Sequence, residues 1–355
     1  MRLADYTTLG LGGPAPVMYT ATSEAEVVEA LRDADRTAGN GGALVLGGGS
    51  NLVIADNGVD VPVVHVAVPG MSIEPDAADP DRAVVTIGAG EDWDTVVAAL
   101  VSDGWTGPES LSGIPGSAGA TPVQNVGAYG TEISDLLLDV SLYDRRTGEL
   151  RTASAADLHL DYRSSVLRGT DTAVVTAVRL CLSRAARPVR YAELARTLGV
   201  AVGDAAPAAD VREAVLALRR AKGMVLDPND ADTRSAGSFF TNPILTDAHL
   251  EDALAAIRQR LGTDITVPRY PADRGVKLSA AWLIERAGFG KGYPGEARPG
   301  AHVTVSGKHT LALTNRGGAT TAELVDLARE IRDGVRAAFA VTLRPEPVFV
   351  GVSID

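Results

Sequence analysis

The chain has 355 residues, of which 45% are hydrophobic and 22% charged, and its net charge is −12. This length is typical of two or three domains, and the composition is ordinary for a globular protein. The negative charge argues against a nucleic-acid partner, because phosphate backbones are bound by basic surfaces. The N-terminal residues lack the apolar segment of a signal peptide, and no apolar run reaches the ~18 residues of a membrane span. We therefore expect a cytoplasmic protein with no membrane insertion.

Cysteine and histidine are too sparse to build a covalent or metal framework. The single cysteine, Cys181, stands in an apolar run, and we expect a small core residue. The five histidines are scattered without the spacing of metal ligands, so no metal site is expected.

The chain begins with a predicted helix followed by strands that flank glycines. Ser23 and Glu26 have the spacing of a capping box, and apolar residues then recur with helical period up to Gly39. Residues 43–54 next predict a buried strand, a turn of three glycines and a second strand.

A second helix follows a second glycine turn. Residues 83–87 predict a strand that ends in glycines, and residues 93–101 predict a helix stopped by Gly104. Glu91 and Asp92 precede this helix, where acidic side chains are typical caps.

The remaining elements are predicted from apolar periodicity and from caps. They are strands near 139–143 and 173–182, a hairpin-like turn at 146–148, a linker over 203–209, a helix capped by Asp210, a helix over 277–287, a helix from the capping box Thr320–Glu323 to Val335, and a strand over 347–352.

The glycine segments match no common nucleotide-binding loop. Residues 88–93 lack the third glycine of a dinucleotide fingerprint, and no P-loop or GxSxG pattern occurs. The uncharged segment 112–125 lies about 65 residues after the first glycine turn. Glycines allow backbone N–H groups to approach an anion or a flat ring. The two segments together predict a clamp for one long ligand, although a buried loop explains either one alone.

Three side chains could carry chemistry. Arg163 stands among hydroxyl residues and could bind a carboxylate through two N–H groups, unless it is a surface arginine. Ser238 precedes two aromatic residues and has no neighbouring histidine, so a Ser-His-Asp hydrolase gains no support, and a structural turn stays open. Glu346 stands between two prolines, a setting that suits an oriented acid or a charged strand edge.

Taken together, these segments resemble the UDP-N-acetylenolpyruvoylglucosamine reductases, in the subclass with a substrate-closing tyrosine loop. The resemblance runs through nearly the whole chain in order and rests on Leu9–Gly13, Leu46–Asn51, Ile114–Gly116, Gln124–Gly130, Tyr162–Ser165, Val189–Leu194, Ala236–Phe240 and Pro345–Pro347. Each motif is weak alone, but their shared order is specific.

The resemblance implies an α+β fold with two domains and a flavin. An FAD-binding domain of the vanillyl-alcohol-oxidase (PCMH) type would cover 1–190, in two subdomains of about 1–70 and 71–190. A smaller α+β substrate-binding domain would cover 205–340, and the segment 341–355 would carry Glu346. The implied activity is NADPH-dependent reduction of the enolpyruvyl UDP-sugar through non-covalent FAD, in peptidoglycan precursor synthesis.

The resemblance also implies roles for individual residues. The catalytic residues would be Arg163 and Glu346, which hold and polarise the substrate, and Ser238, which gives a proton. FAD would be held by Gly47, Gly48, Gly49, Ser50, Asn51, Leu52, Ile114, Pro115, Gly116, Ser117, Gly119, Ala120, Thr121, Gly127 and Val175. The UDP-sugar would be held by Tyr129, Tyr162, Tyr191, Arg219, Lys222 and Asn242.

Some points stay open from the sequence. Residues 223–228 depart from the family pattern after Lys222, which bears on the roles of Lys222 and Arg219. Another FAD-dependent oxidase of the same fold, or a non-catalytic flavin- or sugar-nucleotide-binding protein, is an alternative. We expect a monomer.

Overall fold

The computed structural model describes residues 1–38, 42–272 and 274–355, which form two compact units. Unit 1 comprises Met1, 15–49 and 60–225, and unit 2 comprises 2–14, 50–59 and 226–355. The predicted helix end at Gly39 lies outside the described residues. Within these ranges no helix combines the length and apolarity needed to cross a membrane. The division into an FAD-binding and a substrate-binding domain by function stays a prediction.

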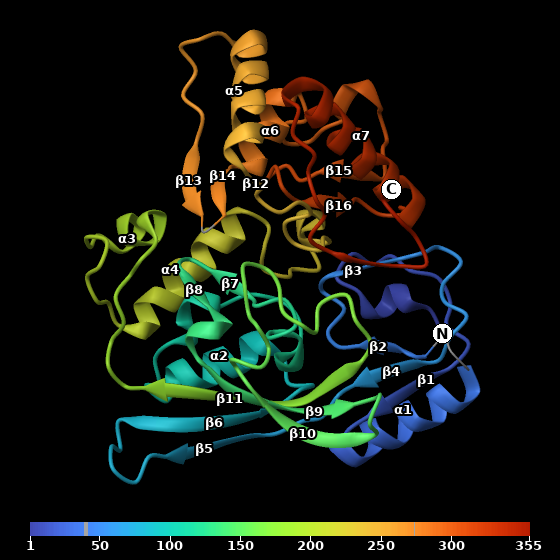
Figure 1. Cartoon of the computed structure of the whole chain (residues 1–355), viewed down its shortest axis with the longest axis vertical. Helices are drawn as coiled ribbons and strands as arrows, with labels where there is room; N and C mark the ends of the chain where they lie inside the picture. Colours follow the sequence, from blue (N-terminus) through green and yellow to red (C-terminus); the bar gives the residue numbers. More distant parts are fainter. Residues whose placement is uncertain (39–41, 273) are drawn as a thin grey trace. The chain divides into compact units, whose positions relative to one another are not determined.

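Two sheets form the framework of unit 1 (Figure 1). The larger sheet is antiparallel, with the order β10-β9-β11-β6-β5, and the smaller is parallel, with the order β1-β4-β2. The bounds are β1 Met18–Ala21, β2 Leu44–Leu46, β4 Val63–Val66, β5 Met71–Pro75, β6 Arg82–Gly88, β9 Leu137–Asp144, β10 Glu149–Ser154 and β11 Ala173–Ser183; a hairpin of β7 Gly127–Ala128 and β8 Thr131–Glu132 stands apart.

Alternating side chains explain how the larger sheet buries one face. Along β11 buried residues alternate with part-exposed ones from Thr176 onward, as the two-residue period of a strand requires. The buried side packs on α2 around Trp93, which is fully buried. The prediction of a core cysteine is wrong, because Cys181 falls on the part-exposed side, where Arg82 Nη2 lies 3.6 Å from Sγ.

The α-helices in the described part of unit 1 are α1 Glu24–Ala38, α2 Trp93–Ser102, α3 Ala192–Leu198 and α4 Ala208–Ala221. The cap at Asp92 is confirmed, because Oδ1 accepts the Thr95 N–H at 2.9 Å. The Ser23 cap of α1 is also confirmed, although the Glu26 carboxylate returns to Thr22 and not to Ser23.

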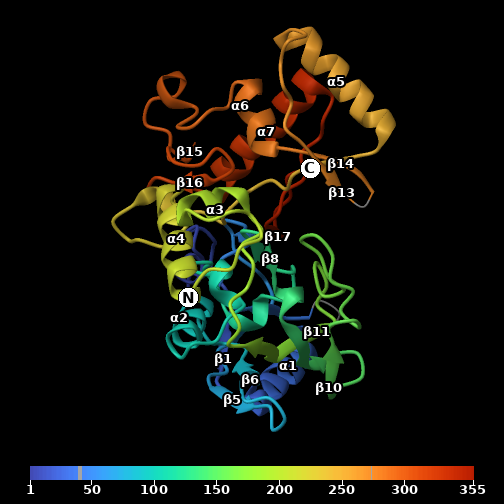
Figure 2. The ribbon, with the colours of Figure 1, turned by 90° about the vertical axis from the view of Figure 1, so that its left-hand side faces the viewer.

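The region before α4 differs from its prediction. The helix begins at Ala208 with Pro207 at the N-cap, so Asp210 lies in the first turn and is not the cap. Proline fixes a backbone angle that suits a helix start, which explains the earlier beginning. The predicted linker is partly paired, because the Val189 N–H donates to the Asp204 carbonyl at 2.8 Å. The helix α3 was not predicted; it packs on α4 (Figure 2).

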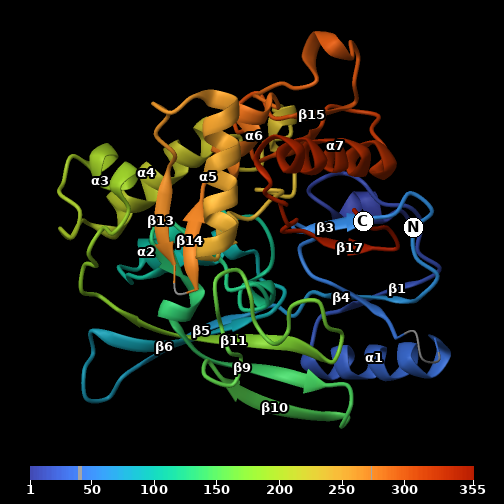
Figure 3. The same ribbon diagram turned by 45° about the horizontal axis from the view of Figure 1, so that its top comes forward.

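Unit 2 has short strands and three helices around an aromatic core. The strands β3 Leu52–Ile54 and β17 Val348–Val350 pair in parallel (Figure 3), and the other pairings are β12 Ile244–Leu245 with β14 Gly275–Leu278, β13 Arg269–Ala272 with β14, and β15 Val303–Val305 with β16 Leu313–Asn315. The helices are α5 Asp247–Leu261, α6 Ala280–Ala287 and α7 Thr321–Phe339.

The sequence signals of unit 2 are partly confirmed. Thr320 and Glu323 form the predicted capping box of α7, and α7 packs on α5 and α6 (Figure 3). The helix predicted over 277–287 begins only at Ala280, because residues 275–278 pair as a strand with two neighbours. The helix α5 was not predicted. The core is centred on Phe239, Phe240 and Phe339, each no more than 1% exposed.

Candidate functional site

Two segments are predicted to hold FAD: Gly47–Leu52, the first flavin segment, and Ile114–Thr121, the second flavin segment. The parts of both that belong to unit 1 meet through their backbones. A Cβ atom added to Gly48 would lie 2.6 Å from Gly116 Cα, and one added to Gly47 would lie 2.5 Å from Ser117 Oγ. Gly49 has φ +60°, a left-handed conformation that favours glycine. Side chains are thus excluded from this loop by contact and by conformation.

The segment after Gly116 is fixed along the start of α2. The Trp93 N–H donates to the Gly116 carbonyl at 3.0 Å, and the Ala118 N–H donates to the Glu91 carbonyl at 2.8 Å. A Cβ atom added to Gly119 would lie 2.5 Å from Ala89 Cβ, so this position also requires glycine. Gly47, Gly48, Gly116 and Gly119 thus form a wall of bare backbone, the glycine wall. Such a wall suits a pyrophosphate and a flat ring, so the residues present fit FAD.

Arg163 is held in an unusual backbone conformation beside the hairpin of β7 and β8. Its φ is +52°, which is rare outside glycine and costs free energy that the surrounding structure must offset. Its Nη2 group donates to the Gly127 carbonyl, and Nη1 lies 3.3 Å from the Asn125 carbonyl and 3.4 Å from Glu132 Oε1. The guanidinium is therefore oriented by groups of its own unit.

Tyr129 occupies the tip of the same hairpin. Tyr129 and Gly130 have φ of +50° and +83°, as the two central residues of a type I′ turn require. The Tyr191 ring meets the Tyr129 ring edge to face at 5.5 Å between centroids. Lys222 Nζ lies 5.8 Å from the Tyr129 ring centre. Three predicted UDP-sugar residues are thus brought together from three segments.

Tyr129, Tyr191 and Lys222 form the tyrosine cluster, and the charged groups around it belong to unit 1. Lys222 Nζ donates to Glu193 Oε2 at 2.7 Å, and both side chains are about one third exposed, at 32% and 30%. Burial raises the pKa of Tyr129 despite the nearby cations Lys222 and Arg219. Tyr129 therefore stays a neutral hydrogen-bond donor near neutral pH.

Arg219 lies deeper than its neighbours. Its Nη2 group donates to the Met224 carbonyl at 2.8 Å, and the Met224 N–H donates to the Arg219 carbonyl at 2.9 Å, so the segment after Lys222 folds back on Arg219. Burial lowers the pKa of this guanidinium, and its Nε atom is buried with no hydrogen-bond partner in the described ranges.

The segments that contain Ser238 and Glu346 pair in unit 2 over a short antiparallel stretch. Phe240 bridges Pro345, and the Glu346 N–H donates to the Phe239 carbonyl at 2.9 Å. The pairing lies on the aromatic core, because Phe239 is fully buried and meets Phe240 at 5.2 Å between ring centroids. Both candidate side chains are part-exposed, and the Ser238 hydroxyl makes no hydrogen bond to another described residue.

The unit 2 part of the first flavin segment supports the same pairing. Asn51 Nδ2 lies 3.5 Å from the Glu346 carbonyl, and the Val348 N–H donates to the Asn51 carbonyl at 2.9 Å. Leu52 pairs with Val348 as β3 meets β17. The Ser50 carbonyl lies 3.4 Å from Thr8 Oγ1.

The remaining predicted residues are less informative. Val175 is 6% exposed and belongs to the core of unit 1, and Asn242 Oδ1 accepts the Ala280 N–H at the start of α6. Tyr162 lies under Arg163, whose Cζ is 5.2 Å from the ring centre. In the second flavin segment, Ile114, Pro115 and Gly116 are part-exposed, Ala120 is exposed and Thr121 is buried. Their roles toward ligands stay predictions.

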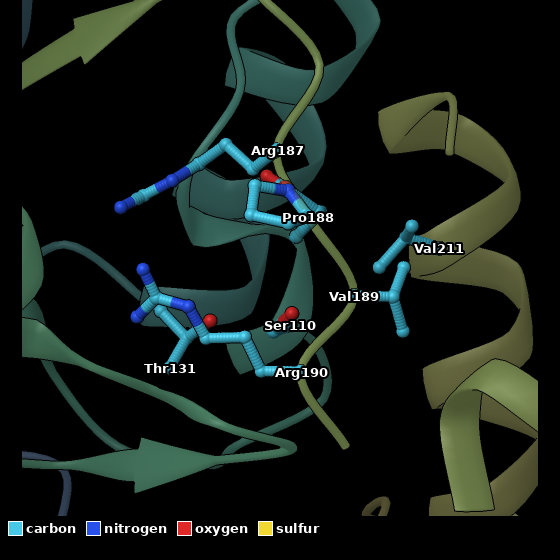
Figure 4. Close-up of a pocket in the computed structure, with 8 residues that line it drawn as sticks. Ser110, Thr131, Arg187, Pro188, Val189, Arg190 and Val211 are labelled. Carbon is cyan, nitrogen blue, oxygen red and sulfur yellow. The ribbon is translucent and has the colours of Figure 1, made fainter. Parts of the chain in front are cut away.

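A small pocket lies beside the tyrosine cluster within unit 1. Figure 4 shows the side chains of Arg187 and Arg190 extending to the same side of their segment, whereas Val189 points toward Val211. Burial raises the pKa of Glu109, which also lines this pocket. The segment of the two arginines leads directly into Tyr191.

Sequence reasoning missed the residues that orient these side chains. Asn125, with φ +42°, donates from Nδ2 to Glu132 Oε2 at 2.9 Å and accepts the Ser134 N–H on Oδ1. Asn125 stands inside a motif that the sequence already singled out, but nothing local marks Glu132 or Glu193 as partners of the cations. Their roles depend on chain segments that meet only in the folded unit.

The glycine wall and the mixed α+β fold define an FAD-dependent oxidoreductase, and the profile described as "FAD binding domain" matches residues 15–154. The profile described as "UDP-N-acetylenolpyruvoylglucosamine reductase, C-terminal domain" matches residues 227–350. The predicted fold class is confirmed.

Known relatives match over the full length. The UDP-N-acetylenolpyruvoylglucosamine reductase of Saccharopolyspora erythraea is 58% identical, over 99% of this chain and 95% of that protein. The reductase of the same name from Thermobifida fusca is 53% identical, over 99% of this chain and 97% of that protein. The chain belongs to the UDP-N-acetylenolpyruvoylglucosamine reductase family, as the resemblance in the sequence predicted.

A solved structure shares the fold. The crystal structure of the UDP-N-acetylenolpyruvylglucosamine reductase from Thermus caldophilus superposes with a TM-score of 0.63 at 24% identity, covering 99% of this chain and 97% of that one.

Proposed function

We propose that this chain reduces the enolpyruvyl group of UDP-N-acetylenolpyruvoylglucosamine to the lactyl group of UDP-N-acetylmuramate, a step of peptidoglycan precursor synthesis. Bound FAD would supply the two electrons, taken from NADPH, and deliver them with one hydrogen to the terminal carbon of the double bond. The chain must then hold the substrate carboxylate, stabilise the negative charge beside it and give one proton to the carbon that bears the carboxylate.

The single observation that carries this proposal is the pairing of Phe240 with Pro345, which brings the chain segment that contains Ser238 beside the segment that contains Glu346. A hydroxyl without an internal acceptor or donor can hydrogen-bond to a ligand. Serine is a weak acid, but a carbanion-like carbon is a strong base, so proton transfer from Ser238 is feasible. Glu346 would donate to the developing charge in its protonated form, and Arg163 would bind the carboxylate through parallel N–H groups.

The tyrosine cluster would hold the other end of the substrate. Tyr129, Tyr191 and Lys222 offer two hydroxyls and one ammonium group, which suit a diphosphate. The alternative, an FAD-dependent oxidase for a sugar or hydroxy acid, requires a base to remove a proton. Ser238 has no histidine or carboxylate hydrogen-bonded to it in the described ranges, which favours proton donation over proton removal.

The test is the spectrum of the purified protein in the absence of oxygen. We expect a yellow protein that releases FAD on acid treatment, loses its visible absorbance with NADPH and regains it when the enolpyruvyl substrate is added. The product should be heavier than the substrate by two hydrogens. A protein that binds no FAD would exclude the proposal, and recovery with oxygen but not with the enolpyruvyl substrate would favour an oxidase.

We also propose a cytoplasmic location and a monomeric state. Nucleotide sugars and NADPH are metabolites of the cytoplasm, which supports the first. Light scattering should give a mass near 36.7 kDa for the monomer.

A further inference from the structure

Gly113 marks the point where the second flavin segment begins. It directly precedes Ile114 and has φ +69°, so its backbone is set in a conformation that other residues rarely adopt. Its N–H donates to Asp94 Oδ1 at 2.6 Å. Asp94 lies in the first turn of α2, so this hydrogen bond ties the entry of the flavin segment to a helix.

Arg212 of α4 holds the same carboxylate from the other side. Its Nη1 group donates to Asp94 Oδ1 at 2.6 Å and its Nη2 group to Oδ2 at 3.1 Å, which makes a two-bond fork. The two side chains are 17% and 31% exposed, so solvent screens this pair less than a surface pair. Burial opposes ionisation of Asp94, but the hydrogen bonds from Arg212 and Gly113 hold its pKa below the ordinary value.

The helix α4 also approaches Gly113 directly, one and two turns after Arg212. A Cβ atom added to Gly113 would lie 2.9 Å from Leu216 Cδ2 and 3.4 Å from Arg219 Nε. The C-cap of α4 is Lys222, which belongs to the tyrosine cluster. One helix therefore contacts both the entry of the flavin segment and the cluster proposed to hold the UDP-sugar.

We propose that Arg212 is a positioning residue for FAD binding, acting through Asp94 on the N–H of Gly113. This inference rests on the proposed function. With Arg212 present, the carboxylate is fixed in place and ionised, and the segment Ile114–Thr121 starts from one defined conformation. Without it, Asp94 loses its main partner and the segment must be ordered when FAD binds, which weakens binding without removing any group that touches the ligand.

The test compares Arg212→Met and Arg212→Lys with a matched control, Arg179→Met. Arg179 forms a similar fork to Asp139 elsewhere in unit 1, so its loss removes an ion pair of the same kind. FAD is removed from each variant, and FAD affinity is measured by titrating FAD back and following flavin fluorescence. Thermal unfolding of the FAD-free proteins is recorded in parallel.

We expect Arg212→Met to weaken FAD binding about tenfold, the range of a charge-assisted hydrogen bond. Arg212→Lys should recover part of the loss, because lysine keeps the charge but not the fork. Arg179→Met should stay within about twofold of the unchanged protein, since it does not contact the flavin segment. Asp94→Asn, which keeps the shape of the side chain, should weaken binding as well, and its effect should not add to that of Arg212→Met.

Two results would overturn the inference: unchanged FAD affinity in Arg212→Met, or equal losses in Arg212→Met and Arg179→Met. If Arg212→Met does not fold, Asp94→Asn alone decides, and unchanged affinity in that variant overturns the inference. These results are distinct from a failure of the proposed function, in which the unchanged protein itself would bind no FAD or would not reduce the enolpyruvyl substrate.

Discussion

The glycine wall of unit 1 and the Ser238–Glu346 region of unit 2 are built by opposite means. At Gly48 and Gly116 the chain excludes side chains so that two backbones can meet. At Phe240 and Pro345 the chain pairs two backbones over a buried aromatic core, and each of the paired segments carries one polar candidate residue, Ser238 or Glu346. The first region depends on shape, and the second depends on the identity of a few atoms.

This difference predicts two kinds of failure. An added methyl group in the glycine wall acts sterically, so it should reduce FAD binding and stability together. Removal of the Ser238 hydroxyl takes away one atom that makes no hydrogen bond to any described residue, so it should leave the fold and FAD binding unchanged. The predictions below test this distinction, beginning with the largest expected effect.

Ser238→Ala should slow the second half-reaction, reoxidation by the enolpyruvyl substrate, by at least about 100-fold, because proton donation contributes on that order. Reduction by NADPH should stay close to normal, since no proton from Ser238 is needed there. Stopped-flow absorbance measures both halves. Thr342→Ala, which removes an exposed hydroxyl of the same unit, is the control. Equal slowing of both halves would assign Ser238 a structural role and remove the distinction.

Gly48→Ala should weaken FAD binding about tenfold or more and lower the stability of unit 1 by about 1–3 kcal/mol, the usual cost of overpacking. The reason is the 2.6 Å approach of a Cβ atom to Gly116 Cα. FAD titration and thermal unfolding measure the two effects. Gly290→Ala is the control, because a Cβ atom there would meet no atom within 4 Å. Normal FAD affinity in Gly48→Ala would show that the loop can open without cost.

Tyr191→Phe should have the smallest effect, a loss of substrate affinity of about 1 kcal/mol, which is one hydrogen bond to a ligand. The ring contact with Tyr129 is kept, so FAD affinity should not change. Calorimetric titration with the UDP-sugar measures the loss. Tyr270→Phe controls for an exposed tyrosine hydroxyl, since Tyr270 is 51% exposed and Tyr191 is 44% exposed. Unchanged substrate affinity would show that the hydroxyl is not used.

Several signals that act within a few residues were read correctly from the sequence, although Asp210 is not the cap of α4. The capping box at Thr320 is formed, and so is the cap at Asp92. The strands near 139–143 and 173–182 are β9 and β11. Where a local signal competed with a partner elsewhere, the prediction was wrong: residues 277 and 278, which the helix prediction included, belong to the paired strand β14.

The sequence by itself determined the secondary structure at well-capped helices and, through its ordered motifs, the family. A cap depends on the conformations and contacts of neighbouring residues, whereas the need for glycine at positions 48 and 119 comes from contacts with Gly116 and Ala89 in the folded unit. Only the tertiary structure decided that Asn125 orients Arg163, that the Ser238 segment pairs with the Glu346 segment and that Arg212 reaches Gly113 through Asp94. The physical reason is that such pairs lie far apart in the chain. Their contact depends on how sheets and helices pack, and a local pattern carries no information about which distant segment will arrive.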